Sequence, residues 1–161
     1  MKKLYLFLMF TLLLLLGGCS RLTPSPHGEI PADELVKITT QYPVYAKDVK
    51  TISFMVENLS DDELFYGVDW RLEKHTANGW MTIPFVENAA FDLTGIQLAP
   101  GRMKSEILYL KMFDYSLTDG TYRIVKEIND QYYAGEFSVG DSPITDENPH
   151  GFVPLEKLPK K

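Results

Sequence analysis

Residues 50–74 read KTISFMVENLSDDELFYGVDWRLEK and decide the fold class of this chain. Apolar and polar residues alternate over residues 50–57, as on a strand with one buried face, and residues 58–62 then turn the chain. A second alternating strand is expected over residues 64–74. The two buried faces are formed by Ile52, Phe54 and Val56 and by Leu64, Tyr66, Val68, Trp70 and Leu72. Because no window of a dozen residues shows an apolar stripe at helical period, the sequence predicts an all-β domain.

The rest of the domain repeats this pattern of short strands and turns. Residues 35–45 are alternating and β-branched, with Pro43 expected at a sheet edge or a kink. Asn78-Gly79 predicts a hairpin turn, followed by a strand over residues 80–85. Further strands are expected over residues 91–98, 102–112 and 132–139, with a turn at Ala99-Pro100-Gly101. About seven strands at this spacing fit a two-sheet antiparallel β-sandwich.

Residues 117–122, LTDGTY, carry the most specific local signal in the domain. They resemble the tyrosine corner of immunoglobulin-type sandwiches, in which a tyrosine hydroxyl bonds to backbone a few residues upstream. Asp119, Gly120 and Tyr122 carry this resemblance, and Tyr122 is expected to begin the next strand.

Short motifs are spread over residues 35–139. They are V-x-N-x-S (Val56, Asn58, Ser60), Y-G (Tyr66, Gly67), L-E-K (Leu72, Glu73, Lys74), G-W (Gly79, Trp80), P-G (Pro100, Gly101) and G-x-Y-R (Gly120, Tyr122, Arg123). Together they resemble a family of bacterial Ig-like domains found in secreted proteins and lipoproteins of Gram-positive bacteria. The resemblance implies an immunoglobulin-like sandwich and no catalytic residues. In such a sandwich Ile124 and Phe54 take the places of the paired cysteines of antibody domains, and Trp70 that of the core tryptophan.

The N-terminus has the pattern of an export signal. Two lysines precede an apolar run over residues 4–16, which is shorter than the roughly 20 residues of a membrane-spanning helix. Leu16, Gly17 and Gly18 then precede Cys19, the only cysteine of the chain. This stretch resembles the lipobox of bacterial lipoproteins, where signal peptidase II cuts before a cysteine that carries lipid. It implies that Cys19 is the lipidated residue and that the three residues before it are read by the peptidase.

The lipobox predicts a protein anchored by lipid to the extracytoplasmic face of the cell membrane. Two or three acyl chains are sufficient for stable anchoring. Ser20 follows the cysteine, so the aspartate that favours inner-membrane retention in Gram-negative cells is missing, and the outer membrane is possible there. The alternative is an ordinary secretory signal with an unrelated cysteine nearby.

Composition divides the chain after the signal peptide into three parts. Residues 19–33 are predicted to be the lipidated N-terminus and a flexible spacer, residues 34–140 the Ig-like domain, and residues 141–161 a Pro-rich tail. Without residues 1–18, 14 basic and 22 acidic residues remain, a formal charge of −8 that argues against nucleic acid as a partner. With Cys19 taken by lipid, no disulfide is possible within the chain.

No cofactor, metal site or catalytic constellation is expected. His27, His75 and His150 lie in different segments and lack the spacing of metal ligands. There is no G-x-S-x-G elbow and no phosphate-binding loop. Two acidic clusters offer oxygens to calcium, but neither follows the D-x-D-x-D-G spacing, and solvated acids are the better interpretation: Asp61, Asp62 and Glu63, and Asp141, Asp146 and Glu147.

Two classes of function remain. The preferred one is a non-enzymatic binding or accessory module that contacts another protein or an envelope polymer, with exposed aromatic residues as contact candidates among Tyr109, Phe113, Tyr115, Tyr132 and Tyr133. The alternative is a proteinase inhibitor, since the chain also resembles, more loosely, small Ig-like bacterial protease inhibitors. Its candidate loops are residues 58–63 and 113–119. An envelope hydrolase is a distant third.

Overall fold

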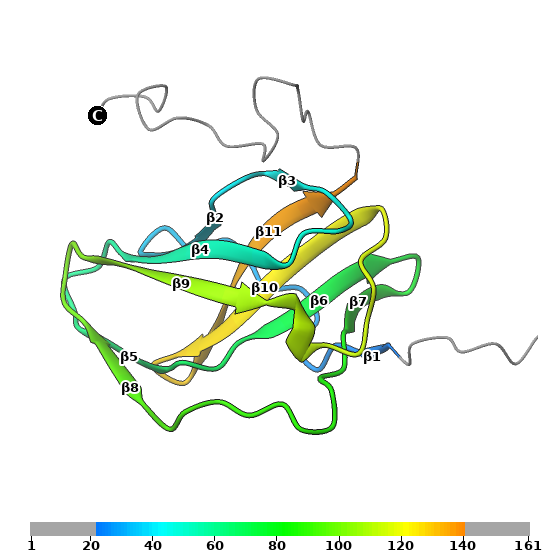
Figure 1. The fold of residues 1–161 in the computed structure, drawn as a ribbon. Helices are drawn as coiled ribbons and strands as arrows, with labels where there is room; N and C mark the ends of the chain where they lie inside the picture. The colour runs from blue at the N-terminus through cyan, green and yellow to red at the C-terminus, as the bar shows by residue number, and fades with distance from the viewer. Residues whose placement is uncertain (1–21, 141–161) are drawn as a thin grey trace, which may run out of the picture.

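The computed structural model describes residues 22–140, which form two β-sheets packed face to face (Figure 1). The larger sheet contains, in order across it, β1 (Thr23–Pro24), β7 (Gly79–Thr82), β6 (Arg71–Thr76), β10 (Gly120–Ile128), β11 (Gln131–Val139) and β3 (Val44–Tyr45). In the same sheet, β5 (Leu64–Gly67) pairs with β10 and with β8 (Gly95–Leu98). The smaller sheet contains β2 (Val36–Thr40), β4 (Thr51–Asn58) and β9 (Met103–Tyr109), and a 3₁₀ turn, η1 (Leu110–Met112), follows β9.

All strand pairs are antiparallel except β3, which lies parallel to β11. The predicted all-β, immunoglobulin-like antiparallel sandwich is therefore confirmed. Alternation along the strands forms the core, as in β4, where Ile52, Phe54 and Val56 are at most 1% exposed. Ile124 of β10 is fully buried in the same core, and Trp70 lies just before β6 with its ring close to those of Phe85, Phe91 and Phe113.

The single strand predicted over residues 64–74 is wrong, because it is two strands, β5 and β6, separated at residues 68–70. The carbonyl oxygens of Gly67 and Asp69 both accept hydrogen bonds from the Lys126 ammonium, each at 3.0 Å. A side chain at Gly67 would meet the Asp69 carboxylate, since a Cβ built there lies 2.4 Å from Oδ1. The backbone therefore turns around a buried cation at this point, which the alternating sequence does not reveal.

The other predicted strands are correct in place and differ in extent. Residues 35–45 form β2 in the smaller sheet and β3 in the larger one, and the change of sheet occurs at Pro43, whose carbonyl accepts a bond from Ser138 N at 2.8 Å. The strand predicted over 80–85 ends at Thr82, although Phe85 forms an isolated bridge with Phe113. The strand over 91–98 begins only at Gly95, and the one over 102–112 ends at Tyr109.

Candidate functional site

The residues just after the predicted lipidation site pack onto the larger sheet, and we call residues 22–29 the strap. Thr23 and Pro24 pair with Thr82 and Met81 of β7, and Ser25 N donates to Trp80 O at 2.9 Å. Leu22 packs against the core. Figure 1 shows this segment, in blue, running beside β7 at the edge of the sheet. The flexible spacer predicted over residues 19–33 is therefore not free over this part, because residues 22–29 belong to the fold.

A buried ion pair lies beneath the strap. Glu73 of β6 and Arg123 of β10 are cross-strand partners, and their side chains are at most 1% exposed. Arg123 donates from Nη2 and Nε to Glu73 Oε2 at 2.7 and 2.8 Å. This bidentate geometry is the strong form of an arginine–carboxylate pair.

The strap completes the hydrogen bonding of both ions. Ser25 Oγ donates to Glu73 Oε1 at 2.7 Å, and Arg123 Nη2 donates to the Gly28 carbonyl at 2.7 Å. The Arg123 guanidinium lies 4.2 Å from the centre of the Trp80 ring, and Trp80 Nε1 donates to the Glu29 carboxylate at 3.3 Å. The strap thus excludes water from two charges that are costly to bury unless fully paired.

Three motifs that carry the family resemblance meet at this place. The glutamate of L-E-K is Glu73, the tryptophan of G-W is Trp80 and the arginine of G-x-Y-R is Arg123. Sequence reasoning named these residues only as family motifs and did not bring them together. Charged residues inside alternating strands were the available signal, because Glu73 and Arg123 stand on strands expected to be central.

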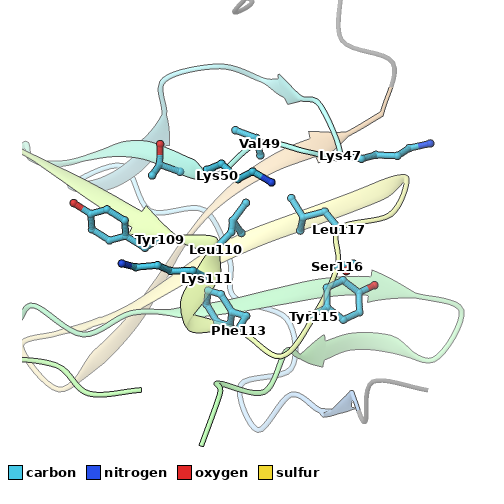
Figure 2. A pocket seen from close by; sticks show the side chains of 11 residues that line it. Lys47, Val49, Lys50, Tyr109, Leu110, Lys111, Phe113, Tyr115, Ser116 and Leu117 are labelled. Atoms are coloured by element: carbon cyan, nitrogen blue, oxygen red, sulfur yellow. The ribbon is translucent and has the colours of Figure 1, made fainter. Parts of the chain in front are cut away.

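A groove of about 530 Å³ opens near the start of β10, away from the strap's ion pair (Figure 2). Its walls are the loop before β4, the end of β9 with η1, and the loop before β10. It is lined by Lys47, Val49, Lys50, Thr51, Tyr109, Leu110, Lys111, Phe113, Tyr115, Ser116 and Leu117. Volumes of this size are common among ligand sites.

The groove has an apolar floor and a cationic rim. Phe113 and Leu117 are buried at 5% and 8% exposure, whereas the lysines of the rim are exposed. No acidic residue lines it, although the described part of the chain is acidic overall. Lys47 pairs with Asp119 at 2.8 Å, and Lys111 Nζ lies 5.7 Å from the centre of the Tyr109 ring. Such a groove suits an apolar group that carries negative charge.

The predicted tyrosine-corner residues form one wall of the groove. The Tyr122 hydroxyl donates to Thr118 O at 2.7 Å and accepts from Thr118 N at 3.0 Å, the bond back to upstream backbone that the motif implies. Gly120 has φ +144°, a conformation that residues with side chains rarely adopt. Burial raises the pKa of the Tyr122 hydroxyl, so it stays protonated and donates.

The remaining candidate residues lie apart from one another. Cys19, its peptidase residues Leu16, Gly17 and Gly18, His150 and the acids at 141, 146 and 147 fall outside the described residues. His27 lies under the strap with its ring 4.1 Å from that of Tyr132, and burial lowers its pKa. The ring of His75 lies 5.0 Å from that of Trp80.

The turn acids Asp61, Asp62 and Glu63 are exposed. Within residues 22–140, no three side chains of histidine, cysteine, aspartate or glutamate are placed to share a metal ion. No helix of this same stretch has the length and apolarity required to cross a membrane.

A family model described as bacterial Ig-like domain matches residues 33–138. Among solved structures, the chain is similar to the alkylpurine DNA glycosylase AlkC of Pseudomonas fluorescens bound to DNA (16% identity, 68% of this chain and 31% of that one, TM-score 0.40). It is also similar to the archaellum periplasmic stator protein FlaG of Sulfolobus acidocaldarius (14% identity, 65% and 99%, TM-score 0.40). A third is the CsuC–CsuE chaperone–adhesion subunit complex of Acinetobacter baumannii (14%, 70% and 62%, TM-score 0.41). No curated protein matches the chain. Because the family model covers most of its length, the chain belongs to the bacterial Ig-like domain family.

Proposed function

We propose that this chain is a non-enzymatic Ig-like module that a lipid on Cys19 anchors to the extracytoplasmic face of the cell membrane. The observation that carries the proposal is the stretch Leu16-Gly17-Gly18-Cys19 after an apolar run of signal-peptide length. The family of the domain supports it, since the Ig-like fold serves as a contact module in many surface proteins.

Incorporation of a labelled fatty acid in growing cells tests the anchor. The full chain is expected to take up label and to sediment with membranes, whereas Cys19→Ser should take up none and leave the membrane fraction. Ser20→Ala is the matched control and should behave like the unmodified chain. A labelled Cys19→Ser protein would contradict the lipobox.

The contact role is assigned to the groove of Figure 2. Its rim lysines and its apolar floor offer a partner both charge attraction and a place for an apolar group. The partner is an envelope protein or an envelope polymer with acidic groups. Covalent cross-linking from Lys50 or Lys111 in intact cells would identify it.

Proteinase inhibition is a second candidate function, favoured by the turn over residues 58–62. Asn58 is fully buried, and its Nδ2 donates to Asp62 O at 2.8 Å and to Leu98 O at 2.9 Å. Its Oδ1 accepts from Ser60 N at 3.0 Å, so the turn is held from within while Leu59 is 38% exposed. An inhibitor needs such a rigid, exposed loop. The other candidate loop, 113–119, turns Phe113 and Leu117 inward.

A panel of serine and cysteine proteases separates the two functions. An inhibitor would block at least one enzyme at micromolar concentration and would lose that effect in Leu59→Ser but not in Leu93→Ser, an exposed apolar control. The binding module is expected to inhibit none of them.

A further inference from the structure

We infer that the strap holds the domain close against the membrane instead of lifting it away, an inference that rests on the proposed lipid anchor. Cys19 lies three residues before Leu22, the first residue seen to pack against the core. An extended chain spans at most about 3.5 Å per residue. The anchoring residue therefore lies within roughly 10 Å of the folded domain.

The docked strap is favoured because it satisfies groups that nothing else in the described chain would cover. Ser25 and Gly28 bond to the two members of the buried Glu73–Arg123 pair. Glu29 accepts from the Trp80 indole, whose side chain is left only 7% exposed. Release of the strap would open an ion pair and a tryptophan to solvent and break all three bonds.

The length of the tether depends on this docking. If residues 19–33 were a free spacer, the fold would begin at Val36, and the 17 intervening steps would span up to roughly 60 Å and average about 20–25 Å as a coil. With the strap docked, only the steps to Leu22 remain, and they attach at the edge beside β7. The partner of the domain must then be a component that lies at the membrane surface.

Two insertions of the same length distinguish a docked strap from a free spacer. The full chain, purified from membranes, is reconstituted in vesicles that contain a dansyl-labelled lipid, and energy transfer from Trp70 and Trp80 to the headgroups is measured. One variant carries about 15 Gly and Ser residues between Arg21 and Leu22, before the strap, which lengthens the tether by roughly 20 Å. The matched control carries the same insertion between Pro31 and Ala32, after the strap, where both residues are exposed.

Insertion before the strap is expected to reduce energy transfer severalfold, and insertion after it to leave transfer unchanged, because the docked strap still sets the distance. Equal loss in both variants, or no loss in either, would overturn the inference. Fatty-acid labelling is measured on the same preparations. A labelled, membrane-bound protein with equal losses rejects the docked strap alone, whereas unlabelled protein rejects the anchor.

Discussion

Lys126 is a cation placed inside the sandwich. Its Nζ donates to Gly67 O and Asp69 O at 3.0 Å and to Glu106 Oε2 at 2.9 Å, and its side chain is fully buried. Since Lys126 belongs to β10 and Glu106 to β9, the pair joins the two sheets. Burial lowers the pKa of Lys126, and the Glu106 carboxylate opposes that shift.

Lys126→Met tests this bridge. The substitution keeps much of the side-chain length but leaves the Glu106 carboxylate and two carbonyls without their donor. Removing one partner of a buried pair typically costs about 3–5 kcal/mol, so the free energy of unfolding in urea should fall by that order. Lys104→Met, an exposed lysine on β9, is the control and should change it by less than about 0.5 kcal/mol. Equal stability of Lys126→Met and the unmodified chain would contradict the structural role of the bridge.

Tyr66 makes stability depend on alkaline pH. Burial, and then the Glu106 charge, raise the pKa of the Tyr66 hydroxyl far above its usual 10.0. Above pH 10 the unfolded chain loses this proton while the folded chain keeps it, so stability falls as pH rises. In Tyr66→Phe this loss should be smaller, and stability at pH 7 should stay within about 1 kcal/mol because the ring still lies against Lys126.

Urea unfolding of both proteins at pH 8 and pH 10.8 measures the difference. Tyr109→Phe serves as the control, since Tyr109 is 43% exposed and has no such burial. A loss of stability between the two pH values that is identical in Tyr66→Phe and the unmodified chain would refute the assignment.

At the scale of elements, the loop before β10 is fixed by its tyrosine. The Tyr122 hydroxyl holds Thr118 from both its backbone groups, and Lys74 reaches across from β6 to Thr118 Oγ1 and to the Tyr115 hydroxyl at 3.3 Å. These contacts give the groove a wall that is already ordered before any partner binds. Order of this kind reduces the entropy cost of binding.

Tyr122→Phe is expected to lower the free energy of unfolding by about 1–2 kcal/mol, because two buried backbone groups lose their partner. Amide exchange at Thr118 should become faster, since its N–H no longer donates to the hydroxyl. If stability and amide exchange at Thr118 both stayed unchanged, the corner would have no part in ordering the loop.

At the scale of the whole molecule, positive charge is separated from a generally acidic surface. Lys50→Glu combined with Lys111→Glu should reduce capture of the partner from intact cells by on the order of tenfold, because the rim of the groove becomes repulsive. The matched control is Lys37→Glu with Lys104→Glu, which changes net charge equally at exposed positions of β2 and β9. Equal losses in both pairs would assign the effect to net charge instead of to the groove.

Local pattern was enough to predict most of the sandwich. Alternation over residues 50–57 gave the buried face of β4, and Asn78-Gly79 gave the turn between β6 and β7, because both signals act between near neighbours in the chain. Strand ends were less predictable. The break between β5 and β6 depends on Lys126, more than 50 residues further along, and no local rule contains it.

The sequence by itself determined the all-β class, the family, the tyrosine-corner motif and the one residue suited to carry lipid, because each depends on residue type at close spacing. Only the tertiary structure decided that residues 22–29 are part of the fold and that Glu73, Trp80 and Arg123 share one site. A segment rich in proline and serine has no periodicity to announce a buried role. Its place depends on an ion pair whose members are 50 residues apart and become neighbours only when β6 pairs with β10.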